Sequence, residues 1–158
     1  MSEAVGNHIL LAKEITALSA SDRWPEARLE WDLLSVYQEE EPQTCLCGHT
    51  PIIEICVIRN RNNGNEAVVG NVCVNKFLGL NSEKIFAGLR RVGKDDSKAL
   101  NEAATLYAFD KGWISKWEKD FSLDTNRKRN LSLKQESKRK EINQRILAKT
   151  RNALRKSG

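Results

Sequence analysis

Four cysteines are the residues of this chain whose types and spacing point most clearly to chemistry. Cys45 and Cys47 form a C-x-C pair that Gly48 follows, and Cys73 stands further along the chain. Two thiolates in a tight turn followed by glycine are typical of a zinc knuckle, because glycine relieves crowding where backbone amides point at the sulfurs. We therefore predict one structural Zn²⁺ site with these three cysteines as ligands.

The fourth ligand has two candidates, Cys56 and His49. Cys56 would complete an all-thiolate site, whereas His49 would give three cysteines and one histidine. Soft thiolates suit closed structural zinc sites, so the residue types favour Cys56. The competing interpretation is a buried free cysteine, and it applies most strongly to Cys56, which stands among Ile and Val residues.

The elements around the cysteines must bring them together. The β-branched run 52–58 and the run 67–69 flank Asn63-Gly64, which is the strongest short-range hairpin signal. Val72–Leu78 is predicted to be a short helix that Gly79 ends, with Cys73 in its first turn. A helix N-terminus stabilises a thiolate. Knuckle, hairpin and helix together predict a treble-clef-like, zinc-stapled hairpin.

This stretch also resembles a known group of proteins. Residues 45–79 carry C-x-C-G-H-x-P-I, Arg59-Asn60, Asn63-Gly64 and V-V-G-N-V-C-V-N-K-F. This pattern is similar to small, largely uncharacterised bacterial and phage zinc-finger-like proteins. Related versions have a C-x₂-C-G knuckle and a histidine at the place of Cys56, so the resemblance implies that Cys56 is a ligand. A looser likeness covers residues 131–135. The resemblance implies a metal site and no particular substrate.

The rest of the chain is predicted to be mostly helical, so the expected fold class is α+β. We expect four parts: an N-terminal helical portion (1–40), the zinc-binding hairpin module (41–80), a second helical portion (81–125) and a long basic C-terminal helix (126–158). Helices are predicted over 5–19, after Ser82 and after Ser97, and Leu33–Tyr37 favours a strand. Ser132-Leu133-Lys134-Gln135 matches a capping box that opens the final helix.

Charge is distributed unevenly along the chain. Residues 126–158 contain 12 Lys or Arg and 2 acidic residues, whereas residues 1–125 have a net charge of −5. A basic segment on an acidic body indicates a polyanionic partner, most often nucleic acid. The predicted phosphate contacts are Arg127, Lys128, Arg129, Lys134, Lys138, Arg139, Arg145 and Lys149. A solvated helix face is the alternative explanation for these residues.

Two further sets of residues bear on nucleic-acid binding. Arg59 and Arg61 lie near the hairpin tip with asparagines around them, and Arg and Asn are the side chains that read guanine and adenine. The same composition is ordinary in a hairpin loop, which is the favoured interpretation. The four tryptophans (Trp24, Trp31, Trp113 and Trp117) stand at helical spacing, which predicts core positions rather than base-stacking positions.

No enzymatic motif is found. The sequence has no glycine-rich phosphate loop or nucleophile elbow, and the predicted ligands leave no histidine or carboxylate at a spacing that would suit a catalytic metal. No signal peptide or membrane span is predicted, so we expect a cytoplasmic protein. The leading hypothesis is a non-enzymatic nucleic-acid-binding protein, with DNA among its candidate ligands. The alternative is a phage or mobile-element interaction factor that acts as inhibitor or adaptor on a host nucleic-acid-handling complex.

Overall fold

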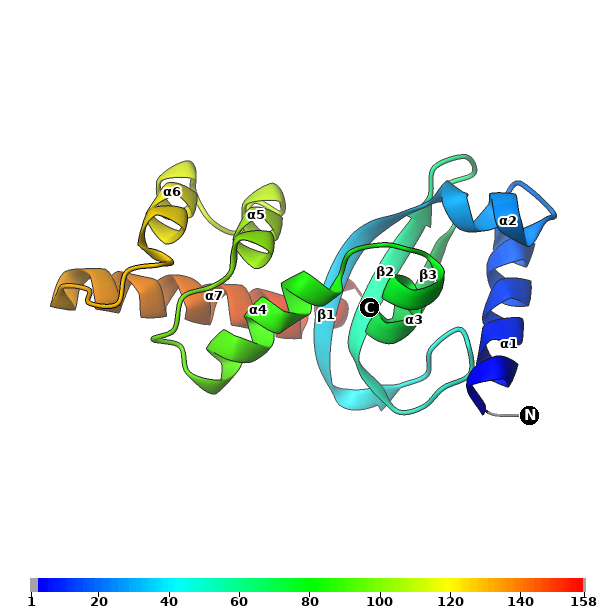
Figure 1. Ribbon diagram of the computed structural model, residues 1–158, viewed down its shortest axis with the longest axis horizontal. Coiled ribbons are helices and arrows are strands. Elements are labelled where there is room, and N and C mark those ends of the chain that lie inside the picture. Colours follow the sequence, from blue (N-terminus) through cyan, green and yellow to red (C-terminus); the bar gives the residue numbers. More distant parts are fainter. Residues whose placement is uncertain (1–2, 158) are drawn as a thin grey trace. The chain divides into compact units, whose positions relative to one another are not determined.

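The computed structural model describes the backbone of residues 3–157 and the side chains of residues 6–39, 41 and 43–151. These residues form seven α-helices, one short 3-10 helix and a three-stranded antiparallel sheet, so the predicted α+β class is confirmed (Figure 1). None of the described helices is both long enough and apolar enough to span a membrane. The chain divides into two compact units, residues 1–83 (unit 1) and residues 84–158 (unit 2).

Unit 1 contains the sheet and the helices around it. Its elements are α1 (Glu3–Leu18), α2 (Trp24–Ala27), the 3-10 helix η1 (Arg28–Glu30), β1 (Trp31–Gln43), β2 (Ile52–Asn60), β3 (Glu66–Gly70) and α3 (Asn71–Phe77). The strand order is β1-β2-β3, with both pairs antiparallel. The predicted segments 1–40 and 41–80 therefore share one sheet, because β1 begins in the first segment and β2 and β3 belong to the second.

The central strand β2 is buried on both faces. Residues 55–58 are all buried, and each pairs with one residue of β1 and one of β3. Residues 55–58 are therefore an uninterrupted buried run of β-branched residues and Cys56, without the alternation of a half-exposed strand. The predicted hairpin is confirmed, with Gly64 at φ 76° in the turn between β2 and β3. The predicted end of the short helix α3 is also confirmed, because Gly79 has a φ of 66°.

A buried carboxylate joins the start of the chain to the hairpin. Glu30 accepts hydrogen bonds from the Asn60 side chain (3.0 Å) and from the backbone N–H groups of Ala20 (2.8 Å) and Ser21 (2.9 Å). These three hydrogen bonds, led by that from Asn60, lower the pKa of Glu30. Because the carboxylate is satisfied by donors from both segments, it fixes the α1–α2 connection against the hairpin turn.

Unit 2 is helical, as predicted. It contains most of α4 (Glu83–Lys94), together with α5 (Glu102–Asp110), α6 (Lys116–Thr125) and α7 (Leu133–Ser157). The predicted apolar stripe of α7 is buried at Ile142, Ile146 and Leu147, while the side chains of Ala153 and Leu154 lie outside the described residues. The predicted capping box is confirmed: Ser132 and Gln135 each accept a hydrogen bond from the other's backbone N–H (3.2 and 3.1 Å).

The predicted start of α5 is wrong. Ser97 does not cap the helix, because its hydroxyl donates to Asp95 (2.6 Å) in the preceding turn. Asn101 caps it instead, accepting from the Ala104 N–H (2.9 Å) and donating to the Lys84 carbonyl (2.6 Å). Asn101 thereby attaches the start of α5 to the start of α4.

Gly88 makes this close approach of α4 and α5 possible. A Cβ at Gly88 would lie 2.4 Å from the Asn101 side-chain oxygen and 2.9 Å from the Ala104 Cβ. We expect Gly88→Ala to destabilise the protein by about 1–3 kcal/mol, although alanine is the better helix former. Gly93→Ala in the same helix is the matched control, because its Cβ would meet the Leu147 side chain at 3.8 Å, an ordinary contact. Urea unfolding of both variants tests this: a Gly88→Ala protein as stable as Gly93→Ala would contradict it.

Candidate metal centre and basic cleft

The loop between β1 and β2 carries the first two cysteines and is held in a tight turn. The Cys45 N–H donates to the His49 carbonyl (2.9 Å), and the Gly48 N–H donates to the Cys45 carbonyl (2.8 Å). Gly48 has a φ of 90°, a backbone conformation that residues other than glycine rarely adopt. The predicted role of this glycine in the knuckle is therefore visible as a backbone conformation that the turn requires.

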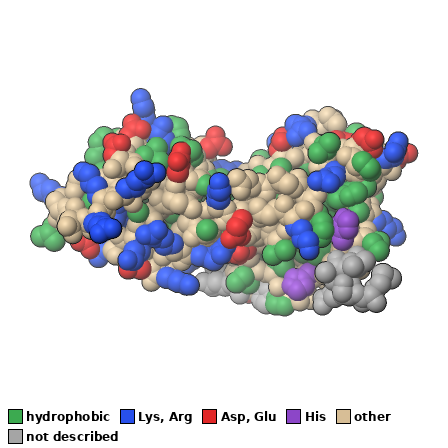
Figure 2. All heavy atoms as spheres, viewed as in Figure 1, with side chains coloured by type: hydrophobic (Ala, Val, Ile, Leu, Met, Phe, Trp, Pro, Cys, Tyr) green, Lys and Arg blue, Asp and Glu red, His purple; other side chains and the backbone are tan. Residues whose placement is uncertain are grey.

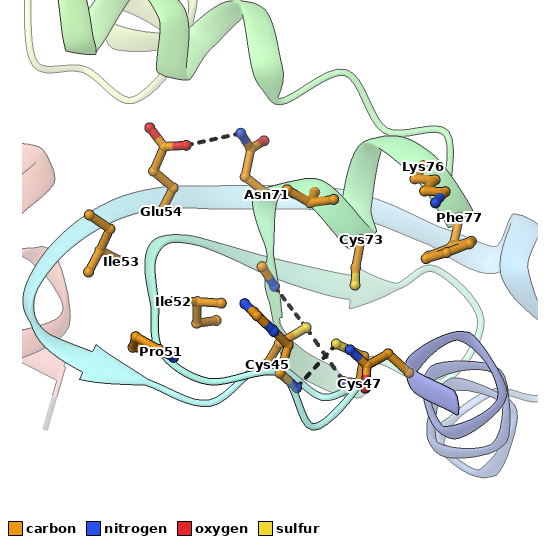
Figure 3. A pocket seen from close by; sticks show the side chains of 14 residues that line it. Cys45, Cys47, Pro51, Ile52, Ile53, Glu54, Asn71, Cys73, Lys76 and Phe77 are labelled. Atoms are coloured by element: carbon orange, nitrogen blue, oxygen red, sulfur yellow. Dashed lines mark hydrogen bonds between the residues drawn. The ribbon is translucent and has the colours of Figure 1, made fainter. Parts of the chain in front are cut away.

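The third cysteine comes from α3. Cys73 is the third residue of this helix, which begins directly after Gly70, the last residue of β3. In Figure 3 the Cys73 side chain extends from α3 toward the loop that carries Cys45 and Cys47. The hairpin therefore returns the chain to the knuckle, and the first turn of the helix places the third sulfur beside the first two.

The three sulfurs form a compact, buried cluster. The Sγ atoms of Cys45, Cys47 and Cys73 all lie within 4.8 Å of one another, and all three residues are buried. Tetrahedral zinc with Zn–S bonds of about 2.3 Å places its sulfurs about 3.8 Å apart, so small side-chain shifts suffice to bind an ion. The three predicted cysteine ligands are thus brought together as a group that could hold a metal.

Backbone amides point at these sulfurs. Cys45 Sγ accepts from the N–H of Gly70 (3.2 Å) and of Cys47 (3.4 Å), and Cys47 Sγ accepts from the N–H of His49 (3.4 Å). Such donors stabilise negative charge on sulfur and are the expected surroundings of a thiolate. The arrangement therefore favours the deprotonated form that binds metals.

The pKa values of the three thiols are shifted in different directions. A hydrogen bond from Cys73, aided by the Gly70 and Cys47 amides, outweighs burial and lowers the pKa of Cys45 to about 5. The same hydrogen bond, together with burial, raises the pKa of Cys73, and burial raises that of Cys47. One sulfur is therefore a ready thiolate, and the other two lose their protons when a cation provides compensating charge.

The structure does not bring Cys56 into the compact cluster, so the preference for Cys56 as fourth ligand stays a prediction. Its sulfur is not among the donor atoms that lie within 4.8 Å of one another. Cys56 is fully buried, and this burial raises its pKa to about 12, against the effect of a hydrogen bond with Ser82. These surroundings agree with the competing interpretation of a buried free cysteine.

His49, the other candidate, lies next to the cluster without joining it. Its side chain is exposed, and its ring nitrogens are not among the donor atoms that lie within 4.8 Å of one another. Its backbone carbonyl and N–H support the turn. His49 does line a cavity of about 420 Å³ onto which all three cysteines open (Figure 3). This cavity is otherwise mainly apolar, with Pro51, Ile52, Ile53, Val72 and Phe77 in its wall.

The basic segment contributes to a second cavity, in unit 2. A cleft of about 470 Å³ is lined by six cationic side chains and a single acidic one, Glu136. The cations are Arg91 from α4, Lys98 from the α4–α5 loop, Arg127, Lys128 and Arg129 from the α6–α7 connection, and Arg139 from α7. Figure 2 shows several Lys and Arg side chains close together on the surface of unit 2. We call this cavity the basic cleft.

The predicted basic face of α7 is partly used within the protein. Arg145 and Lys138 both pair with the buried carboxylate of Glu118 on α6, at 2.8 and 3.3 Å. Arg139 donates to the backbone carbonyls of Ser97 (3.2 Å) and Thr125 (2.7 Å). These three predicted phosphate contacts therefore stabilise unit 2, whereas Lys134 and Lys149 are exposed.

The hairpin arginines are also engaged in contacts within unit 1. Arg61 forms an ion pair with Asp32 (2.7 Å) and donates to the Leu29 carbonyl, which attaches the hairpin turn to η1 and β1. Arg59 pairs with Glu66 across the hairpin at 3.6 Å. These contacts agree with the favoured interpretation of the tip as ordinary hairpin composition.

Sequence reasoning misses two features of the protein surface. Arg91 and Lys98 are not among the predicted contacts, because they stand on other segments and only the folded chain places them beside residues 127–129. Trp117, predicted to lie in the core, is 61 % exposed, and its ring stacks on that of Phe121 at 5.3 Å between centroids. Trp31 alone of the four tryptophans is buried as predicted, at 2 % exposure.

Comparison with models of known protein families, with curated protein sequences and with solved structures gave no match. The resemblance to zinc-finger-like proteins is therefore not supported by these comparisons. Among the described residues, the groups best suited to bind a ligand are gathered at the three-cysteine cluster and at the basic cleft.

Proposed function

We propose that this chain is a non-enzymatic nucleic-acid-binding protein that holds phosphates in the basic cleft, with a structural Zn²⁺ ion at the three-cysteine cluster. The observation that carries the proposal is the convergence of six cationic side chains, from separate segments of unit 2, on one cavity. The sequence predicted phosphate contacts mainly along α7, whereas we now propose that the phosphates bind in the basic cleft.

The positive charge of the basic cleft is poorly compensated by the protein itself. Glu136 is the one acidic residue of its wall, and it also pairs with Lys140 at 3.7 Å. Burial, followed by the nearby charge of Arg91, lowers the pKa of Arg139. A cleft lined by cations concentrates their positive electrostatic potential, and this potential attracts anions. A phosphate would offset this positive potential.

A nucleic acid fits this charge distribution better than a single small anion. Arg127, Lys128 and Arg129 are consecutive and exposed, and further exposed cations, Lys134 and Lys149, follow on α7. Several exposed cations on one unit can contact successive phosphates of a backbone, and each neutralised phosphate releases counterions. Arginine also forms two parallel hydrogen bonds to a phosphate, which gives the contacts direction.

The proposed zinc ion has a structural role in unit 1. It would tie the β1–β2 loop to the start of α3, in addition to the hydrogen bond from the Leu46 N–H to the Val68 carbonyl (3.3 Å), which joins the loop to β3. Thiolate ligands and the knuckle geometry support zinc over the harder metals, which prefer oxygen. The metal and the basic cleft lie in different units, so each can be tested alone.

A salt titration with matched variants tests the proposed binding. We expect single- and double-stranded oligonucleotides to bind the full chain with an affinity that falls steeply with salt. Replacing Arg127, Lys128 and Arg129 by Gln should weaken binding on the order of tenfold to a hundredfold at about 0.1 M salt and reduce the log–log salt slope by about 2–3. Fluorescence anisotropy measures both quantities.

The control removes the same charge from another place on unit 2. Lys134, Lys149 and Arg151 are exposed on α7 and do not line the basic cleft. Replacing these three by Gln should weaken binding less than the substitutions in the cleft. Equal losses from both triple variants would show that net charge decides binding, and absent or salt-insensitive binding would contradict the proposal itself.

A second candidate function is the phage or mobile-element interaction factor that inhibits or adapts a host complex. The exposed Trp117 ring, stacked on Phe121, favours it, because tryptophan is enriched among the residues that contribute most to protein interfaces. Under this alternative, Trp117→Ala would abolish binding to a protein partner, and the Gln substitutions in the basic cleft would leave that binding unchanged.

A further inference from the structure

The three-cysteine cluster supplies three donors, whereas tetrahedral zinc has four. We infer that the fourth coordination position is exchangeable, faces the 420 Å³ cavity, and accepts a small organic thiol from solution. This inference rests on the proposal that the cluster binds a metal. It differs from the closed, four-ligand site that the sequence predicts.

The protein ligands present at the cluster support this inference. Among the described residues, this group of metal-ligating atoms within 4.8 Å of one another has three members, the sulfurs of Cys45, Cys47 and Cys73. Cys56 is not in this group, because its sulfur is not among the donor atoms that lie within 4.8 Å of one another. Glu54, which lines the cavity, accepts a hydrogen bond from the Asn71 side chain (3.3 Å), which itself also donates to Glu83 (2.6 Å). A site with three protein ligands and an accessible fourth position is the arrangement in which zinc exchanges ligands.

The cavity indicates which kind of ligand would fit. The three cysteines line it together with mainly apolar residues, among them Ile53 and Val72, which are 57 % and 73 % exposed. Phe77 lines it on the α3 side, with the Lys76 ammonium 5.3 Å from the centre of its ring. An apolar wall favours a ligand with a hydrocarbon body, and a metal with soft ligands favours a sulfur donor. Lys76 provides a cation near the added negative charge.

The proposed binding step is a ligand exchange and involves no oxidation. Cys45, Cys47 and Cys73 would hold the metal. The incoming thiol would lose its proton to solvent, and its thiolate would take the place of a water as the fourth donor. Because metal-bound thiols are deprotonated, the exchange should release one proton per thiol bound.

Cobalt substitution gives the site an optical signal. The full-length protein is loaded with one equivalent of Co²⁺ and titrated with 2-mercaptoethanol, while its visible and near-ultraviolet absorption is recorded. We expect a saturable increase in sulfur-to-cobalt charge-transfer absorption, with the d–d bands remaining those of a tetrahedral ion. Azide is the comparison probe, and we expect it to bind more weakly. If Co²⁺ binds and the thiol leaves the spectrum unchanged, the fourth position is closed and the inference is overturned.

Variants separate the remaining outcomes. If His49 occupied the fourth position, His49→Ala would change the Co²⁺ spectrum before any thiol is added, and this result would overturn the inference. Cys56→Ser should leave both the spectrum and the thiol response as in the wild type. Val72→Trp narrows the cavity rim, so the thiol concentration at half-saturation should rise about tenfold; an unchanged value would contradict binding through the cavity. Failure to bind Co²⁺ at all would overturn the metal proposal, and this inference with it.

Discussion

Removing the proposed zinc ion should destabilise unit 1, and this is the largest effect that we expect. The cluster brings sulfurs of the β1–β2 loop close to a sulfur at the start of α3. Two of the three sulfurs accept hydrogen bonds from backbone N–H groups, as thiolates would. Without the ion, mutually repelling thiolates or buried, protonated thiols must replace the metal bonds. We expect a chelator to lower the free energy of unfolding by at least about 3 kcal/mol, a modest share of what structural zinc contributes in small domains.

Cys73→Ser should reproduce this loss and make the protein insensitive to the chelator. Thermal or urea unfolding, followed by far-ultraviolet circular dichroism with and without EDTA, measures both effects. Cys56→Ser is the matched control, since it replaces another buried cysteine of unit 1 and should keep the full response to the chelator. A wild-type protein with the same unfolding curve in both conditions would contradict a structural role for the metal.

Glu118→Gln is the prediction with the second largest expected effect. Glu118 is buried on α6, where it completes a capping box with Ser115 and pairs with Arg145 and Lys138 of α7. Burial alone would raise its pKa, but the hydrogen bonds from Arg145, the Ser115 N–H and Lys138 prevail and lower the pKa of Glu118 to about 2. We expect the substitution to cost about 2–3 kcal/mol, because it leaves two cations facing a neutral amide.

The pH dependence of this effect has a definite sign. A carboxylate whose pKa falls from 4.5 in the unfolded chain to about 2 in the folded protein stabilises the fold above pH 4.5. That contribution is lost as the pH falls from 4.5 toward 2, so wild type and Glu118→Gln should converge in stability at the acid end. Asp120→Asn on the same helix, where an exposed carboxylate lies 3.8 Å from Lys119, should change stability by less than about 0.5 kcal/mol. A constant difference between wild type and Glu118→Gln from about pH 7 to about pH 2 would contradict this assignment.

Local signals in the sequence predicted the local features of the fold. Asn63-Gly64, Gly79 and the Ser132–Gln135 box each act through residues a few positions apart, and all three predictions are confirmed. Ser97 shows the limit of such signals. Its hydroxyl donates to Asp95 in a local turn, and the helix begins only at Glu102, where Asn101 caps it.

The parts of the site that depend on tertiary structure could not be predicted. Whether Cys56 joins the other three cysteines depends on how β2, the β1–β2 loop and α3 pack, and in the folded chain its sulfur is not in their group. Lys138 and Arg145 were predicted to contact phosphates because their acidic partner, Glu118, is distant in the sequence. Only the folded chain places Glu118 beside them. The basic cleft combines residues of separate segments, so charge counting along the chain located residues 127–129 but neither Arg91 nor Lys98.

Metal analysis of the purified full-length chain tests the central claim most directly. Inductively coupled plasma mass spectrometry of protein expressed in zinc-containing medium should find one equivalent of zinc per chain in the wild type and in Cys56→Ser. Cys45→Ser and Cys73→Ser should contain far less than one equivalent, because two sulfurs hold the ion poorly. Absence of metal from the wild type, or its loss in Cys56→Ser together with retention in Cys73→Ser, would contradict a centre built from Cys45, Cys47 and Cys73.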